Sequence, residues 1–290
     1  MITFRRLSHD DYDDILDISK DIWQGSDYLP RLFHKWVDSE GYFLGAVDSD
    51  KNKVVGVGKF SILYDKSGWL EGLRVHINYR GQKIGRLISE RLLEIAREYL
   101  KEGKINKIAF ATYIDSIESI SLMKKLGFKL EYAEYMFHKE YKNLNLNISL
   151  KDFKVSPWNL SFEKFLDLSC IKKRNNLFNL AFVLQKPTLE LYNQLKEEGA
   201  FITINNFNGI FKLKGEPNFL LEEISFEAIN TFMNYFLLKY KDSGYESPCT
   251  TITREDKYLI PKLKQEGFES WSNWQLDYFY FIHNSFKQVL

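Results

Sequence analysis

The chain has 290 residues, which is long for one ordinary domain and sufficient for two, each able to bury its own core. Hydrophobic residues make up 44% and charged residues 27%, a composition typical of soluble globular proteins. With 40 Lys and Arg against 39 Asp and Glu, the chain lacks the bulk charge that would favour nucleic acid or an anionic membrane surface. We therefore expect neither as a partner.

Cysteine usage and the N-terminus favour a cytoplasmic protein. Cys170 and Cys249 are too few for a disulfide framework and form no C-x-x-C pair, so we expect buried free thiols. The first residues, MITFRRLSHDDYDD, lack the apolar region of a signal peptide. No window approaches the ~18 uninterrupted apolar residues that a membrane span requires.

The first forty residues predict one strand and two helices. Residues 2–7 (ITFRRL) form the strand. Ser8 and Asp11 have the spacing of a capping box that begins a helix extending to about Lys20. A loop, QGSDYLP, leads to a second helix with Pro30 in its first turn, where the missing N–H would be unpaired anyway.

The next hundred residues predict a mixed sheet. Strands at about 42–47, 54–63 and 69–75 are separated by turns at 48–52 and 65–68. A helix at about 84–101, a strand at 107–113, a helix that ends at Gly127 and a long strand complete the segment. The order β-α-α-β-β-β-α-β-α-β predicts an α/β fold, with a mixed sheet and helices on its faces.

The second half of the chain repeats this pattern. After a polar linker at residues 143–152, residues 184–204 can be laid over 27–47, and residues 249–279 over 110–138. We therefore expect a duplicated unit. The second copy is shorter, because FLLEEI runs directly into the helical SFEAIN without a basic, glycine-containing turn.

That turn, YRGQKIGR at residues 79–86, is the strongest functional motif. It lies between a predicted strand and a predicted helix, where unpaired N–H groups and the helix dipole favour an anion. Arg80, Lys83 and Arg86 add positive charge, and Gly81 and Gly85 let the backbone approach a ligand closely. The turn therefore predicts a phosphate site; the alternative is a structural turn with solvated basic residues.

The strand LRV, the turn RGQKIG and a downstream helix ending in LMKKLGF together resemble the GNAT acetyltransferase superfamily over about residues 1–141. The resemblance implies a GNAT domain at residues 1–143, a degenerate GNAT-like domain at 151–290 that lacks the turn, and acetyl-CoA as cosubstrate. The family pattern is Arg/Gln-x-x-Gly-x-Gly/Ala, and Lys83 replaces its middle glycine, so a positive φ there would be strained. The implied CoA-binding residues are Leu73, Arg74, Val75, Arg80, Gly81, Gln82, Lys83, Ile84, Gly85 and Arg86.

Acetyl transfer to an amine needs a base and, for the departing thiolate, an acid. We predict Glu71 as the base, on the same face of its strand as Leu73 by strict alternation. The family's usual tyrosine is replaced by Met123, which leaves Tyr113 as the candidate acid. The alternatives are a solvated or salt-bridged carboxylate for Glu71 and ordinary sheet packing for Tyr113.

The loop WQGSDYLPRLFHKW and the strand EGLRV resemble the histidine N-acetyltransferase family, which also carries a C-terminal domain. The resemblance implies transfer to the α-amine of free histidine or a similar amino acid, with Asp27 and Tyr28 as acceptor-side residues. Arg74 is a candidate partner for a substrate carboxylate, although alternation points it away from Glu71.

Two other functions remain open from the sequence: peptide or protein N-acetylation, and non-catalytic acyl-CoA binding. The oligomeric state is not predicted. The five histidines show no metal-ligand spacing, so no metal is predicted, and His76 is interpreted as a surface loop residue.

Overall fold

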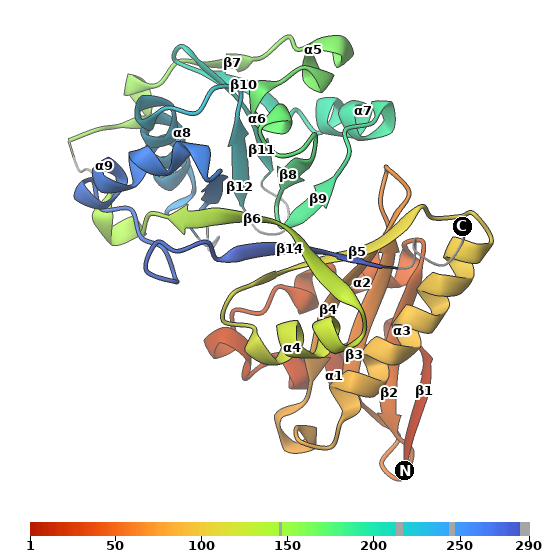
Figure 1. The fold of residues 1–290 in the computed structure, drawn as a ribbon. Coiled ribbons are helices and arrows are strands. Elements are labelled where there is room, and N and C mark those ends of the chain that lie inside the picture. The colour runs from red at the N-terminus through yellow and green to blue at the C-terminus, as the bar shows by residue number, and fades with distance from the viewer. Residues whose placement is uncertain (145–146, 213–216, 244–246, 285–290) are drawn as a thin grey trace. The chain divides into compact units, whose positions relative to one another are not determined.

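The computed structural model describes residues 1–144, 147–212, 217–243 and 247–284 (Figure 1). The described chain divides into two compact units. Unit 1 contains residues 1–110, 117–130 and the described residues from 281 onward, and unit 2 contains residues 111–116 and 131–280. Residues 145 and 146 of the predicted linker lie outside the described residues.

Unit 1 is built on a sheet whose first four strands are antiparallel neighbours, followed by a fifth that is parallel to the fourth. One helix lies against one face of this sheet, since a Cβ at Gly58 would meet Ile88 and Leu92 of that helix. Two helices pack with Phe43 and Val57 on the other face. The elements are β1 (Ile2–Arg6), α1 (Tyr12–Ser19), α2 (Leu29–Asp38), β2 (Tyr42–Asp48), β3 (Lys53–Ile62), β4 (Ser67–Val75), α3 (Ile84–Lys101), β5 (Lys107–Tyr113) and α4 (Ile117–Lys125), with short 3-10 helices η1 (His9–Asp11), η2 (Ile22–Gly25) and η3 (Ile77–Tyr79).

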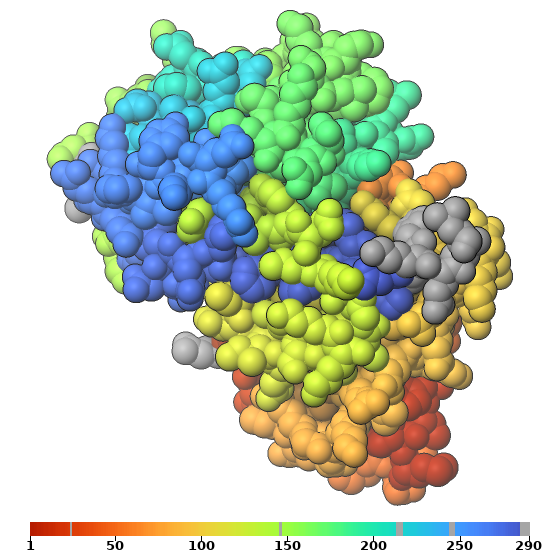
Figure 2. All heavy atoms as spheres, viewed as in Figure 1, coloured from red at the N-terminus to blue at the C-terminus, as the bar shows by residue number. Residues whose placement is uncertain are grey.

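The local signals in unit 1 explain where these elements begin and end. Ser8 and Asp11 form the predicted capping box, which begins η1 and leads into α1. Pro30 lies in the first turn of α2. Gly127 has a φ of +97° just after α4, as expected for a left-handed helix stop. The outer face of α3, visible in yellow in Figure 2, is exposed and largely charged.

Unit 2 is also an α/β unit. Its sheet has the strand order β6-β13-β12-β11-β10-β7, and β8 and β9 form a separate hairpin. Its described elements are β6 (Phe128–His138), η4 (Tyr141–Asn143), η5 (Leu150–Asp152), β7 (Val155–Pro157), α5 (Phe162–Leu166), α6 (Ser169–Lys172), β8 (Phe178–Leu180), β9 (Val183–Gln185), α7 (Leu189–Glu197), β10 (Phe201–Ile204), β11 (Phe207–Lys212), β12 (Asn218–Leu221), α8 (Phe226–Tyr240), β13 (Cys249–Ile252), η6 (Glu255–Leu259), α9 (Ile260–Gln265) and β14 (Tyr278–His283).

Strand pairing in unit 2 repeats that of unit 1. The pairs β7·β10, β10·β11 and β11·β12 are antiparallel and β12·β13 is parallel, as are β1·β2, β2·β3, β3·β4 and β4·β5. Matching glycines follow matching helices: Gly41 and Gly199 follow α2 and α7 with φ values of +93° and +66°, and Gly127 and Gly267 follow α4 and α9 with +97° and +78°. The predicted α/β fold class, a mixed sheet with helices, is therefore confirmed, and unit 2 repeats the strand pairing of unit 1.

The two units exchange their last strands. β6 follows α4 of unit 1, but its C-terminal residues pair with β13 in unit 2. β14 follows α9 of unit 2, but residues 281–283 belong to unit 1, where the Phe281 ring stacks on Phe110 with centroids 4.9 Å apart. The predicted boundaries, 1–143 and 151–290, did not include this exchange.

Buried aromatic and aliphatic side chains fill the core of unit 2. Phe232, Phe236 and Phe219 lie at the centre of one cluster, and Phe165 and Leu195 belong to another. Cys170 and Cys249 are both buried thiols, as predicted. None of the helices in the described ranges combines the length and apolar character needed to cross a bilayer.

Candidate active site

A bulge in β4 sets the direction of the candidate catalytic side chains. Between the pairs Val57↔Arg74 and Lys59↔Glu71, β3 advances two residues while β4 advances three. Gly72 takes up the extra residue with a φ of +67°, which is the geometry of a glycine bulge. Because directly paired residues share a face, Glu71 and Arg74 both lie on the α1/α2 side of the sheet.

Strict alternation therefore gave the wrong face for two residues. Leu73 lies on the α3 side, where its side chain approaches the positions of Gly58 and Gly85. Glu71 does not share a face with Leu73, and Arg74 does not point away from Glu71. The signal was present in the sequence, since an isolated glycine within a strand pattern is typical of a bulge.

Glu71 lies half-buried beside polar groups from β3. The Ser61 hydroxyl donates a 2.6 Å hydrogen bond to Oε1 of Glu71. The Lys59 ammonium, fully buried on the paired position, is electrostatically coupled to the same carboxylate. Glu71 is thus a half-buried, hydrogen-bonded carboxylate on the α1/α2 side of the sheet, and its role as base stays a prediction.

The acceptor-side candidates form a compact cluster with Arg74. Nε and Nη2 of Arg74 each donate to one Asp27 oxygen at 3.0 Å, and Nη1 donates to the Leu73 carbonyl at 3.1 Å. The guanidinium also lies over the rings of Trp23 and Tyr28, 4.7 and 5.2 Å from their centroids. This two-point ion pair connects the η2–α2 loop to β4.

Charges in this cluster influence one another. Burial raises the pKa of the Tyr28 hydroxyl, with the Glu71 carboxylate contributing in the same direction and Arg74 opposing it. Burial disfavours the Arg74 charge, but Tyr28 and Asp27 more than offset this and raise the pKa of the guanidinium. Both Arg74 and Tyr28 are therefore in their ordinary charge states, cationic and neutral, at neutral pH.

The predicted phosphate turn presents an open helix N-terminus. Gly81 has a φ of +79° and Lys83 a φ of +63°, so the chain turns sharply into α3. No side chain caps α3, and the first helical bond runs from the Leu87 N–H to the Lys83 carbonyl. The N–H groups of Ile84, Gly85 and Arg86 therefore lack intrahelical acceptors. Gln82 and the basic side chains of Arg80, Lys83 and Arg86 are exposed around them.

Lys83 occupies the left-handed conformation that its place in the family pattern predicted to be strained. Non-glycine residues with this φ are uncommon, and the conformation costs roughly 1–2 kcal/mol. Gly85 differs, because a Cβ there would meet only Val75 and Leu73 at ordinary distances of 3.5 and 3.9 Å. The protein itself leaves room for a side chain at Gly85.

The corresponding helix of unit 2, α8, has a capped N-terminus. The Ser225 hydroxyl accepts a hydrogen bond from the Ala228 N–H, so α8 supplies its own N-cap. Glu222 and Glu223 precede it, where unit 1 has basic residues. An anion is favoured at the start of α3 and disfavoured at the start of α8.

The C-terminal part of β4 has a backbone edge that β5 does not cover. β4 pairs with β5 only from Ser67 to Trp69, although it continues to Val75. Beyond Trp69, Leu73 and Val75 of the described strand lack a β5 partner. An extended ligand can hydrogen-bond to such an edge.

The candidate general acid lies in unit 2. The Tyr113 ring packs edge-on against Trp271, with centroids 6.1 Å apart, and burial raises the pKa of its hydroxyl. Its role stays a prediction. Met123, at the family's usual tyrosine position, is buried in α4 of unit 1 and has no proton to donate.

His76 differs from its prediction as a surface residue. It is 9% exposed, its Nδ1 accepts a hydrogen bond from the Asn78 N–H, and its Nε2 lies 3.3 Å from Asp17. It therefore stabilises the segment between β4 and the turn. Within the described ranges, no three His, Cys, Asp or Glu side chains are grouped so as to hold a metal ion.

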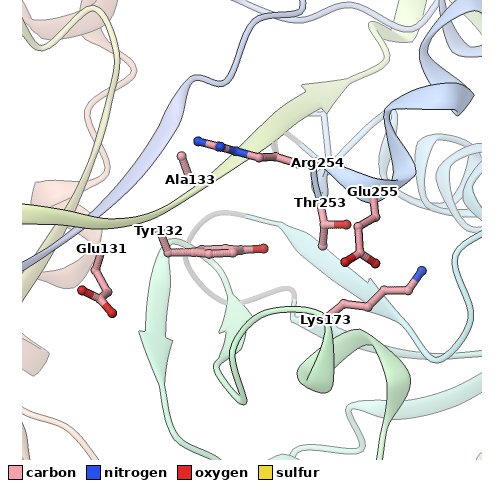
Figure 3. A pocket seen from close by; sticks show the side chains of 7 residues that line it. All are labelled: Glu131, Tyr132, Ala133, Lys173, Thr253, Arg254 and Glu255. Carbon is pink, nitrogen blue, oxygen red and sulfur yellow. The ribbon is translucent and has the colours of Figure 1, made fainter.

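A polar cavity of about 300 Å³ lies within unit 2 (Figure 3). Its lining carries charges of both signs, and the Lys173 ammonium is paired with Asp256 at 2.9 Å. No residue predicted for CoA, acceptor or catalysis lines it. The lining residues are Glu131, Tyr132, Ala133, Lys173, Thr253, Arg254 and Glu255.

The open turn, the adjoining strand edge and the bulged β4 lie within the segment that resembles a known family. Residues 9–128 match the model of the acetyltransferase (GNAT) family. Over this segment the chain is similar to GNAT acetyltransferases. Members of the family use acetyl-CoA as acyl donor.

Solved structures share the fold over nearly the whole chain. A GCN5-related N-acetyltransferase from Sphaerobacter thermophilus matches with a TM-score of 0.62 at 10% identity, covering 97% of this chain and 95% of its own. A candidate acetyltransferase from Pyrococcus horikoshii matches with a TM-score of 0.60 at 17% identity, covering 97% and 88%. At these identities the likeness shows a shared fold over nearly the whole chain.

Proposed function

We propose that the chain transfers an acetyl group from acetyl-CoA to a primary amine, with its one acyl-CoA site at the turn of residues 79–86. The observation that carries the proposal is the contrast between the two helix N-termini. α3 begins without a side-chain cap among exposed basic residues, whereas α8 is capped by Ser225 and preceded by two glutamates. Only the first suits a pyrophosphate.

In this proposal the pyrophosphate is held by the N–H groups of Gln82 to Arg86 and by the charges of Arg80, Lys83 and Arg86. A Cβ at Gly81 would have no protein atom within 4 Å, and one at Gly85 would have only ordinary contacts, so both leave space on the ligand side. Leu73 and Val75 offer their open backbone edge to the pantetheine arm. Arg74 supports this edge through its hydrogen bond to the Leu73 carbonyl.

The chemistry needs a neutral amine beside the thioester. The amine nitrogen bonds to the acetyl carbon, the carbon–sulfur bond breaks, and the sulfur leaves as a thiolate. Glu71 accepts the proton that the amine loses, directly or through a water. Tyr113 is the proposed proton donor to the thiolate, since Met123 cannot act in this way.

We further propose a free amino acid, histidine or a similar one, as the acceptor. The bulge at Gly72 supports this, because it brings Glu71 and Arg74 to the same face of β4. One small substrate can then present its α-amine to Glu71 and its carboxylate to the N–H groups of Arg74 that Asp27 leaves available. Tyr28 and Asp27 would line this acceptor side and hold the guanidinium in place.

The test is to incubate the purified protein with acetyl-CoA and each free amino acid, and separately with a peptide pool, while following thiol release and product mass. A single acetylated amino acid would support the proposal. Acetylated peptides alone would replace it with peptide N-acetylation. CoA binding without any product would favour a non-catalytic acyl-CoA-binding module.

A further inference from the structure

Lys59 is a fully buried cation that the reaction described so far does not use. It lies in β3 with no exposed surface, although lysine side chains are almost never buried unless they are paired. Its Nζ donates to the main-chain carbonyls of Trp36 and Glu40, each at 3.0 Å. Trp36 lies in the last turn of α2 and Glu40 directly follows its C-cap, so the ammonium is at the helix end where the dipole favours a positive charge.

These two hydrogen bonds fix the ammonium but do not neutralise it, because both acceptors are uncharged oxygens. Burial of the ammonium lowers the pKa of Lys59 from 10.5 to about 8, with Arg6 acting in the same direction and the Glu71 carboxylate opposing both. A cation held at such a cost needs an anion nearby to balance it.

Glu71 is positioned to be that anion. It is the cross-strand partner of Lys59, and directly opposed side chains share a face with their Cβ atoms roughly 4.5–5.5 Å apart. The Ser61 hydroxyl, two residues along β3, holds Oε1 of Glu71 at 2.6 Å. Among the described residues, the ionisable groups that also face the carboxylate include Tyr28, and Arg74 with its partner Asp27.

Arg74 does not replace Lys59 in this role. Its charge is matched by Asp27 through two 3.0 Å hydrogen bonds, and the pair is nearly buried. Arg6 does not replace it either, since its Nη2 donates to the Gly41 carbonyl and its charge acts on Lys59 by repulsion. The Lys59 charge therefore has no dedicated carboxylate other than Glu71 among the described residues of this face.

We infer that Lys59 is a positioning residue for Glu71: its buried ammonium keeps the Glu71 carboxylate ionised and in place on the face where the acceptor amine loses its proton. The inference rests on the proposed role of Glu71 as base. It assigns Lys59 no contact with substrate and no proton transfer of its own.

The test is a titration of Glu71 by ¹³C NMR on protein labelled at glutamate side-chain carboxyls, without substrate. The Glu71 signal is assigned by its loss in Glu71→Gln. In Lys59→Met, which nearly keeps the length of the side chain and removes its charge, we expect Glu71 to titrate at least about one pH unit higher than in the wild type. Lys53→Met, on the exposed end of the same strand, is the matched control and should leave the titration unchanged.

A reciprocal measurement covers the outcome in which Lys59→Met does not fold. Coupling between two sites is equal in both directions, so the ¹⁵N-detected titration of Lys59 should fall by the same amount in Glu71→Gln. An unchanged Glu71 titration in folded Lys59→Met, or an unchanged Lys59 titration in Glu71→Gln, would overturn the inference.

The same variants separate this inference from the proposed function. If acetyl transfer is found, the acidic limb of the kcat/KM profile should shift upward in Lys59→Met in step with the Glu71 titration, while the Kd for CoA stays unchanged. Coupling without transfer to any amine would retain the Lys59–Glu71 pair and remove the proposed function. Transfer without coupling would retain the function and remove the role of Lys59.

Discussion

Glu71 and Arg74 lie three positions apart on β4, yet their side chains share the α1/α2 face of the sheet. An odd spacing in a regular strand would place them on opposite faces. The bulge at Gly72 reverses this, and it does so at the position where a base and a carboxylate-binding group can meet one small substrate. Gly72 is thus the residue on which the proposed acceptor geometry depends.

Gly72→Ala should strongly destabilise the protein. A Cβ at Gly72 would lie 2.4 Å from Cζ3 of Trp36, and the φ of +67° is unfavourable for alanine. The two effects together should cost about 3 kcal/mol of unfolding free energy. Gly103→Ala is the control, because its φ is +70° with no atom within 4 Å, and it should cost only about 1 kcal/mol. Urea unfolding measures both, and equal losses would contradict the packing argument.

Lys83→Gly should stabilise the fold while retaining CoA binding. Glycine removes the energetic penalty of the +63° φ, but it also gives the unfolded chain more conformational freedom. The net gain in unfolding free energy should be roughly 0.5–1 kcal/mol. Lys66→Gly, at a φ of +60° in the β3–β4 turn, should give a similar gain without any change in CoA affinity. If Lys83→Gly abolished CoA binding, the side chain rather than the backbone would carry the site.

Gly85→Glu should abolish CoA binding without unfolding the protein. The nearest protein atoms to a Cβ at this position lie at 3.5 Å, so the fold can accept a side chain, but the carboxylate would meet the bound pyrophosphate. We expect the Kd measured by calorimetry to rise at least about 100-fold, with Gly85→Gln losing less because it adds bulk without charge. An unchanged Kd would remove the turn as the CoA site.

Glu71→Gln should lower kcat on the order of 10²–10⁴-fold with little change in CoA affinity, since the amide keeps the size of the side chain and loses its basicity. Steady-state kinetics on the acceptor found in the amine panel measures the effect. The residual rate should no longer show the acidic limb of the pH profile. A variant as active as the wild type would mean that solvent or another group takes the proton.

Lys59 should make the stability of the protein depend on pH in alkaline solution. Its pKa is about 8 in the folded chain against an ordinary value of 10.5, so between these values the unfolded chain keeps a proton that the folded chain has lost. Unfolding free energy should therefore rise with pH across this window, by up to about 3 kcal/mol relative to Lys59→Met. Parallel pH curves for wild type and Lys59→Met would contradict this.

The sequence predicted the elements of the GNAT domain well because their signals are local. The capping box at Ser8 and Asp11, the proline in α2 and the glycine after α4 each act within one turn of a helix. The turn at residues 79–86 was found for the same reason, since a strand, a glycine-containing basic segment and a helix follow one another directly.

The arrangement of side chains within the site depends on contacts that local patterns do not contain. The isolated Gly72 is a local sign of the bulge, but the close approach of Trp36, which lies in α2 far from β4 in sequence, is absent from the local pattern. The local pattern does not distinguish Lys59 from other polar strand residues, because its two hydrogen-bond acceptors come from a segment that is distant in sequence. The exchange of β6 and β14 could not be predicted either, because the hydrophobic pattern of each strand is compatible with both units.

That exchange has a consequence for biosynthesis. Phe281 and His283, which pack against Phe110 and Leu126 of unit 1, leave the ribosome only after all of unit 2 has been translated. At about 5–20 residues per second, the roughly 150 residues in between take on the order of ten seconds or more. Unit 1 therefore cannot be completed before unit 2 has been translated.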